Sequence, residues 1–173
     1  LPAALSAHLA PFSAFFCSCT RDATATFGGY LRGLFQSERA NLLRMSEVNA
    51  VDHQSMQHML AGGAVDWDGF GDQLAQEANV LLGGAQSVLL IDESGFAKKG
   101  ERSAGVARQW HGRLGKVDNG QVGVFAALCR GAMASLVDAR LYLPQAWADD
   151  PERCERAAIP ERARDYRSKT ALA

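Results

Sequence analysis

An apolar run near the middle of the chain ends on a carboxylate. The segment SVLLID (87–92) closes with Asp92, and Glu93 follows at once. A carboxylate at the end of a buried strand can bind a metal ion or transfer a proton, because the strand holds it rigidly while the next loop leaves it accessible. Neighbouring side chains of a strand point to opposite faces, so Asp92 and Glu93 are not expected to act as a close pair. Asp92 is therefore the candidate catalytic and metal-binding residue, with an ordinary turn-capping role as the alternative.

Positive charge follows this carboxylate closely. Residues 98–116 contain six basic side chains and one acidic side chain, a net charge of +5 within a chain whose overall net charge is −1. The six are Lys98, Lys99, Arg102, Arg108, Arg113 and Lys116. Such a patch indicates a polyanionic partner, and a merely solvated loop is the alternative. Trp110 lies in the same segment, where its indole could stack on a base, although packing is the simpler role for a tryptophan.

Other chemical motifs are excluded by their spacing. GRLGKV (112–117) lacks the Ser or Thr of a phosphate-binding P-loop, and DESGF (92–96) is not the nucleophile elbow of hydrolases. The four cysteines, at 17, 19, 129 and 154, do not have the paired spacing of a zinc site, so we interpret them as reduced thiols of a cytosolic protein. No apolar run reaches the roughly 18 residues that span a membrane.

The elements that must position Asp92 fall into two regions. Residues 1–85 have apolar positions at helical spacing, which predicts a helical bundle. Two of its helices are predicted to end at glycine pairs, Gly62-Gly63 and Gly83-Gly84. The hydrophobic fraction of 47% is sufficient for a real core.

The second region changes pattern to short apolar runs. Residues 87–92, 121–129 and 134–143 are predicted strands, the first of them buried on both faces. A turn at 130–132 joins the last two, so the three strands form an antiparallel meander. Pro144 ends the third strand, and a helix follows with Asp150 as its N-cap and Pro151 at its first position. The fold class is therefore α+β or α/β.

Two long segments carry a resemblance to a known family. LLIDESGFAKKGERSAGVARQWHGRLGKVDNGQVGVFAAL and DARLYLPQAWADDPERCERAAIP resemble the insertion-sequence transposases of the DDE superfamily. YLRGLFQSERANLLRMSE and QHMLAGGAVDWD are similar to the helical region before the core of that family. Several motifs agree in the same order, and the match covers most of the chain from about Tyr30 onward.

The resemblance implies a DNA-cutting and DNA-joining enzyme. It implies a helical region at 1–85 followed by part of an RNase H-like catalytic core at 86–173. In such enzymes the aspartate that ends the first core strand, here Asp92, is the first of three acidic ligands of Mg²⁺ or Mn²⁺. The six basic residues would then bind the phosphates of transposon-end and target DNA. The family also implies a homo-oligomer in the bacterial cytoplasm, associated with the nucleoid, and no membrane partner.

The departures from the family pattern limit this expectation. The second Asp and the Glu of the family lie on later elements than this chain contains, and Asp138, Asp149 and Asp150 occupy no matching motif. Ser94 stands where the family has Thr. We therefore expect the N-terminal part of a transposase, inactive alone. The alternatives are a catalytically dead DNA-binding or regulatory protein and a soluble α+β domain with a solvated basic loop.

Overall fold

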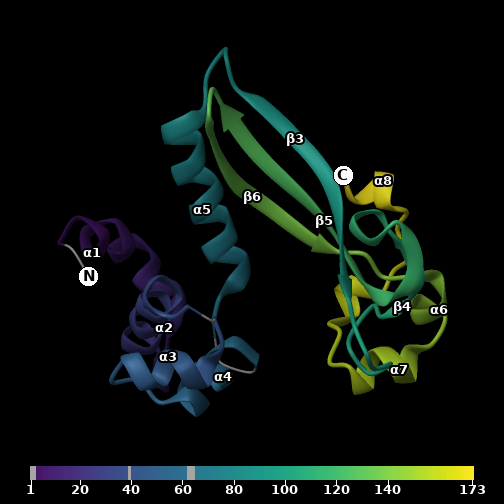
Figure 1. Cartoon of the computed structure of the whole chain (residues 1–173), viewed down its shortest axis with the longest axis horizontal. Coiled ribbons are helices and arrows are strands. Elements are labelled where there is room, and N and C mark those ends of the chain that lie inside the picture. Colours follow the sequence, from purple (N-terminus) through teal and green to yellow (C-terminus); the bar gives the residue numbers. More distant parts are fainter. Residues whose placement is uncertain (1–2, 39, 62–64) are drawn as a thin grey trace. The chain divides into compact units, whose positions relative to one another are not determined.

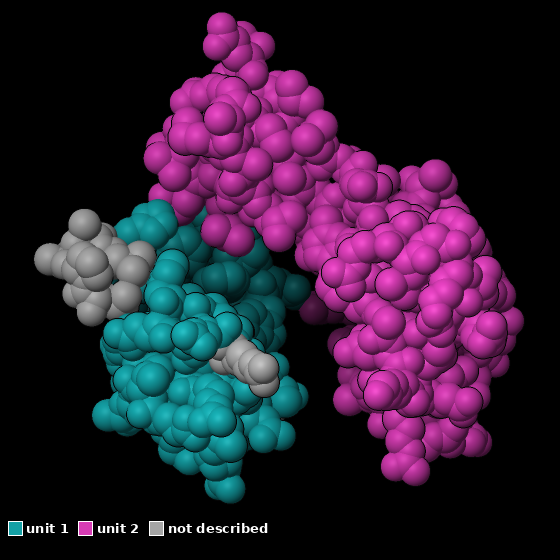
Figure 2. All heavy atoms as spheres, viewed as in Figure 1, with its two compact units in different colours: residues 1–73 teal, residues 74–173 magenta. Residues whose placement is uncertain are grey.

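A computed structural model describes residues 3–38, 40–61 and 65–173 of the chain. The chain divides into two compact units, residues 1–73 and residues 74–173 (Figure 2). Helices and antiparallel strands are both present, which confirms the α+β class. Among the helices of these residues none is long and apolar enough to cross a membrane.

The first unit is mainly helical (Figure 1). Its elements are α1 (Ala3–Leu9), the 3-10 helix η1 (Ala10–Phe16), α2 (Thr24–Gln36), α3 (Leu42–Val48), α4 (His53–Ala61) and the beginning of α5 (Trp67–Leu82). A short antiparallel ladder, β1 (Cys17–Ser18) with β2 (Arg21–Asp22), lies between η1 and α2, so the region is not helical throughout. The predicted end of α4 at Gly62-Gly63 lies outside the described residues, whereas α5 ends just before Gly83-Gly84, as predicted.

Aromatic rings and small residues pack this unit. Phe16 stacks on Phe27 with their ring centroids 3.9 Å apart, and Phe70 meets both rings edge-on. On α2, a Cβ at Gly33 would lie 2.6 Å from Cγ of Met45, so only glycine lets α3 approach this closely. The sequence pattern of apolar and small residues thus gives a tightly packed helical unit.

The second unit contains a four-stranded antiparallel sheet. Its strands are β3 (Val88–Ala97), β4 (Ala107–His111), β5 (Lys116–Arg130) and β6 (Met133–Leu141). The long strand β5 pairs with β3 along one edge, while β4 and β6 pair with successive parts of its other edge. The turn between β5 and β6 is centred on Gly131, whose φ of 61° favours glycine. The predicted meander of β3, β5 and β6 is confirmed.

Three expectations for this sheet are wrong. Strand β3 continues beyond Asp92 to Ala97, because residues 120–124 of β5 extend the pairing. The basic segment contains strand β4 and the 3-10 turn η2 (Gly112–Leu114), and is not simply a loop. The apolar residues of β3 are about half exposed, because hydrophobicity alone does not show whether another layer covers a strand.

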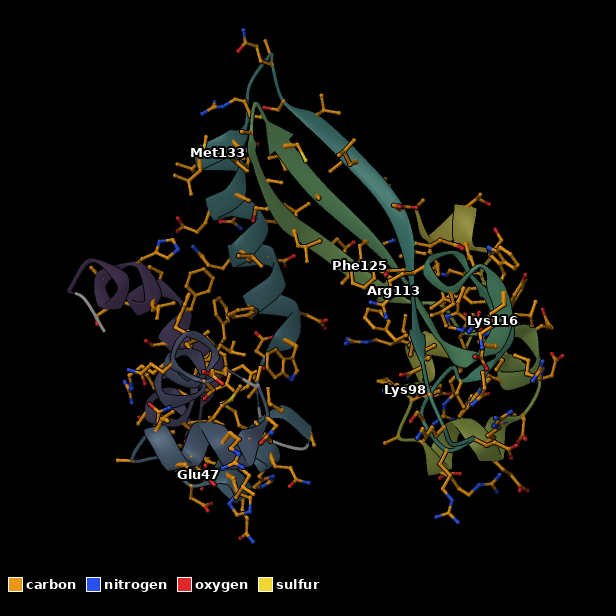
Figure 3. All side chains as sticks on the ribbon, viewed as in Figure 1. Glu47, Lys98, Arg113, Lys116, Phe125 and Met133 are labelled. Atoms are coloured by element: carbon orange, nitrogen blue, oxygen red, sulfur yellow. The ribbon has the colours of Figure 1, made fainter. Side chains whose placement is uncertain are left out.

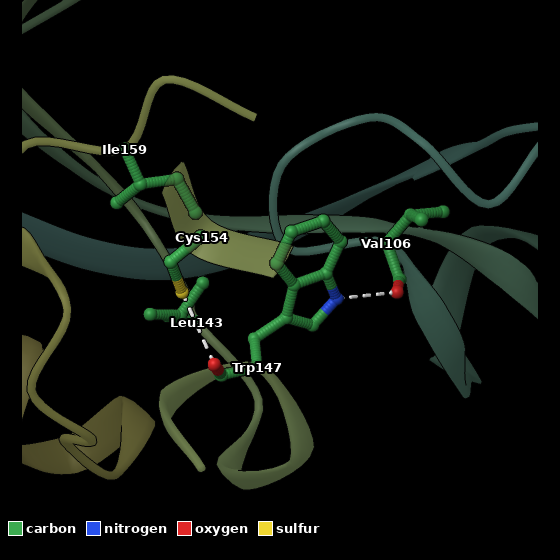
Figure 4. Packing of buried hydrophobic residues seen from close by; sticks show 5 residues of the cluster. All are labelled: Val106, Leu143, Trp147, Cys154 and Ile159. Atoms are coloured by element: carbon green, nitrogen blue, oxygen red, sulfur yellow. Dashed lines mark hydrogen bonds between the residues drawn. The ribbon is translucent and has the colours of Figure 1, made fainter. Parts of the chain in front are cut away.

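The end of the chain packs beside strand β4. The short helices α6 (Gln145–Ala148) and α7 (Pro151–Arg156) are followed by η3 (Glu161–Ala163) and α8 (Lys169–Leu172). As predicted, Asp150 caps α7 by accepting the N–H of Arg153, and Pro151 follows it. Figure 4 shows the core they form, which consists of Val106, Leu143, Trp147, Cys154 and Ile159.

Trp147 anchors this core. Its ring is 1% exposed, and Nε1 donates a hydrogen bond of 2.8 Å to the carbonyl oxygen of Val106. The thiol of Cys154 donates to the carbonyl oxygen of Trp147 at 3.1 Å. All four cysteines are free, as predicted. The packing role predicted for tryptophan holds for Trp147, whereas Trp67 and Trp110 are about half exposed.

A buried histidine fills the junction of β3, β4 and β5. His111 is 1% exposed, and neither ring nitrogen has a hydrogen-bond partner in the part of the chain described. Its ring lies against Gly95 and Gly120, where a side chain would collide with it; a Cβ at Gly120 would lie 2.6 Å from Nε2. These two glycines are therefore required by the space that the imidazole occupies.

We predict that Gly120→Ala destabilises the protein by about 1–3 kcal/mol, because the added methyl group overpacks against His111 and the backbone of Phe96. Urea denaturation measures the free energy of unfolding. The control is Gly100→Ala, whose added methyl group meets no atom within 4 Å and should change stability by less than about 0.5 kcal/mol. Equal effects of the two substitutions would contradict the packing role.

Candidate functional site

Asp92 lies in the middle of a strand and not at its end. In β3 it is directly opposite Phe125 of β5, and its side chain is exposed. Its Oδ1 accepts a hydrogen bond of 2.8 Å from the N–H of Glu93. The aromatic rings of Phe96 and Phe125 meet edge-on on the same face, with centroids 6.1 Å apart. The sheet therefore holds Asp92 rigidly on an accessible, partly apolar surface.

Glu93 belongs to the opposite face, as predicted. Its Oε2 forms an ion pair of 2.8 Å with Nζ of Lys169 in α8. On the same side, Nη1 of Arg140 donates to the carbonyl oxygen of Leu172 at 3.1 Å. Helix α8 is therefore fixed against the Glu93 face, and the Asp92 face is the one that α8 leaves open.

The other candidate carboxylates have structural partners. Asp138 is paired in register with Ala126, a neighbour of Phe125, so it faces away from Asp92, and it forms an ion pair of 2.9 Å with Arg140. Asp149 accepts a hydrogen bond from Gln145, and Asp150 caps α7. In residues 3–38, 40–61 and 65–173, no three His, Cys, Asp or Glu side chains come together as a metal site.

Lys98 and Lys99 follow the end of β3. Lys98 is six positions after Asp92 in the sequence, which at about 3.3 Å per strand residue places their Cα atoms up to roughly 20 Å apart. Figure 3 shows Lys98 and Lys116 toward the end of the sheet that contains β4, and Arg113 nearer to Phe125 in this view. Asn119 fixes the turn after β3, because its Nδ2 donates to the carbonyl oxygens of Lys98 and Gly100 at 2.9 Å each. Lys98 and Lys99 are thus presented from an ordered turn.

The six basic residues do not form one uniform patch. Arg102 and Arg108 line a pocket of about 890 Å³ together with Arg153 and Arg156 of α7. Sequence reasoning missed the last two arginines, because they follow the basic segment by some forty residues. The available signal was the spacing in PERCER, which brings two arginines three residues apart onto neighbouring positions of a helix.

Lys116 is engaged by a neighbouring carboxylate. Its Nζ lies 2.8 Å from Oδ2 of Asp118. This hydrogen bond, followed by the one that Asp118 accepts from the N–H of Asn119, holds the pKa of the Asp118 carboxyl below its ordinary value of 3.8. Since the ionised form is favoured in the folded protein, its stabilising effect is present above pH 3.8 and is lost as the pH falls through the lowered pKa.

We predict that Lys116→Gln raises the pKa of Asp118 toward its ordinary value, because the largest cause of its lowering is removed. Carboxyl ¹³C chemical shifts followed between pH 2 and pH 6 measure this change. Lys99→Gln is the control, since Lys99 does not contribute to the Asp118 shift. An Asp118 pKa unchanged by Lys116→Gln would contradict the ion pair.

Comparison with known proteins gives a family match and one curated relative. A family model described as "DDE superfamily endonuclease" matches residues 14–173. The "Probable transposase for insertion sequence element IS701" of Microchaete diplosiphon is 33% identical over 88 residues, which cover 50% of this chain and 23% of that protein. The match thus spans less than a quarter of the relative's length. No solved structure matches the chain.

Proposed function

Because this chain belongs to the DDE superfamily of endonucleases, we propose that it is the N-terminal part of a transposase that cuts and rejoins DNA. The family implies a divalent metal cofactor and a DNA partner. The observation that supports the proposal most directly is the position of Asp92, which the sheet holds rigidly on its open face. In this proposal Asp92 is one acidic ligand of the metal, Mg²⁺ or Mn²⁺, in an RNase H-like core.

In this proposal Asp92 alone does not provide the ligands of a two-metal site. Metal-dependent phosphoryl transfer at a two-metal site requires several carboxylates around the reacting phosphate. The described residues bring no such group together around Asp92. We therefore propose that this polypeptide does not cleave DNA alone.

The basic segment supports DNA binding more directly. Lys98 and Lys99 are exposed, and each phosphate they neutralise releases counterions from the duplex. Lys116 contributes less in this proposal, because Asp118 already neutralises its charge. As in other enzymes that act on paired DNA ends, the complete transposase would work as a homo-oligomer.

We expect the purified chain to bind duplex DNA at low salt, and the double substitution Lys98→Gln with Lys99→Gln to weaken binding at least about fivefold, because two phosphate contacts are lost. Fluorescence anisotropy of a labelled oligonucleotide at several salt concentrations measures the affinity and its salt dependence. Arg21→Gln, an exposed arginine of the first unit, is the control and should change affinity little. Absence of binding at low salt would contradict the proposed DNA partner.

We also expect no nicking of supercoiled plasmid carrying transposon ends when the 173-residue chain is incubated with Mg²⁺ or Mn²⁺. Conversion to open-circular plasmid on agarose gels measures nicking. The informative comparison is Asp92→Ala. Metal-dependent nicking by the unaltered chain that disappears in this variant would show that the chain completes an active site and would overturn the expected inactivity.

A further inference from the structure

A basic pocket lies between strand β4 and helix α7, away from Asp92. We call it the arginine pocket and define it by the four arginines of its lining, Arg102, Arg108, Arg153 and Arg156. Glu101 is the acidic residue of its lining, so the pocket has a formal net charge of +3. All these residues belong to the second unit, and the core around Trp147 forms its base.

One of the four arginines is held in place by the fold. The guanidinium carbon of Arg153 lies 3.8 Å from the ring centroid of Trp147, and Nη2 donates to the carbonyl oxygen of Glu101 at 3.2 Å. Trp147 itself is fixed by its hydrogen bond to Val106. Because the guanidinium is oriented before any ligand arrives, little side-chain entropy is lost on binding.

The other three arginines, Arg102, Arg108 and Arg156, keep most of their charge available for an anionic ligand. No ion pair among the described residues involves Arg102 or Arg108. Arg156 lies 3.5 Å from Glu152, but both side chains are largely exposed, so this pair is weak. Four positively charged residues line one pocket, and an anionic ligand would reduce the repulsion between their charges.

The chemistry of the pocket selects phosphate. The planar guanidinium group donates two parallel hydrogen bonds that match the oxygens of a phosphate, and several such groups favour a polyanion. The volume of about 890 Å³ lies in the range of small-ligand sites and accommodates a nucleotide. Val106, Ala107 and Ala157 add an apolar wall, which a sugar or base can contact.

We propose that the arginine pocket is a phosphate-binding site, separate from Asp92, that holds the phosphodiester backbone of a bound DNA strand. The proposal rests on the proposed function only for the source of the phosphate. It assigns binding roles to Arg153 and Arg156, which lie outside the basic segment 98–116.

The test is the double substitution Arg108→Gln with Arg156→Gln in the 173-residue chain. Anisotropy with a labelled duplex at low salt should show affinity reduced at least about tenfold, and a slope of log affinity against log salt reduced by about one to two, because up to two phosphate contacts are lost. The matched control, Arg21→Gln with Arg167→Gln, removes the same charge from two exposed arginines outside the pocket and outside the basic segment 98–116, and should weaken binding less than about threefold. Equal losses of DNA affinity in the two double variants would overturn the proposed phosphate-binding role of the arginine pocket.

A charge-conserving variant separates binding from folding. Arg108→Lys with Arg156→Lys keeps both charges but loses the paired N–H groups of guanidinium, so it should bind DNA more tightly than the glutamine variant and more weakly than the unaltered chain, while circular dichroism melting verifies that each variant is folded. A lysine variant that binds as tightly as the unaltered chain would contradict the guanidinium contacts on which the phosphate site is argued.

Binding of inorganic pyrophosphate tests the phosphate site independently of the proposed DNA function. Isothermal titration calorimetry should detect its binding to the unaltered chain and not to Arg108→Gln with Arg156→Gln. Pyrophosphate binding without any DNA binding would overturn the DNA function and leave a phosphate site. The opposite outcome is a chain that binds DNA but not pyrophosphate, and whose glutamine variant loses no more DNA affinity than the control variant. It would overturn the phosphate-binding role of the pocket and leave the proposed DNA function intact.

Discussion

The pairing of β5 with three other strands is the constraint on which the second unit depends. Strand β5 extends over Lys116–Arg130 and has neighbours on both edges, so its register fixes β3 on one side and β4 and β6 on the other. Asp92 is set opposite Phe125 by this ladder, and the basic turn after β3 is set by Asn119, which is also a residue of β5. The positions of the carboxylate and of the positive charge are thus consequences of one strand.

Burial in this unit is uneven. The buried residues of the sheet, Val122, Val124 and His111, lie toward the end that β4 and the C-terminal helices cover. Toward the β5–β6 turn, Val88 and Leu89 of β3 and Leu136 of β6 are more than half exposed. An edge strand with exposed apolar residues favours association with other chains. The same openness leaves Asp92 accessible, since α8 covers only the Glu93 face.

Charge is distributed over the unit in two separate arrangements. Asp92 lies on the open face of the sheet, whereas Arg102, Arg108, Arg153 and Arg156 line a pocket at the end formed by β4 and α7. Separation reduces direct neutralisation of Asp92 by these arginines, because Coulomb attraction falls with distance and exposed charges are screened within about 10 Å.

The sequence by itself determined the family, the α+β class, the meander of three strands, the Gly131 turn and the Asp150 cap, because these depend on local residue patterns. It also indicated that Asp92 and Glu93 face apart, since strand geometry alternates side chains. It could not determine the length of β3 or the presence of β4, because both depend on pairing with distant residues of β5. Only the tertiary structure decided that β3 is exposed, that His111 requires Gly95 and Gly120, and that Arg153 and Arg156 join Arg102 and Arg108. Contacts between residues far apart in the chain produce each of these features, and a local pattern does not encode them.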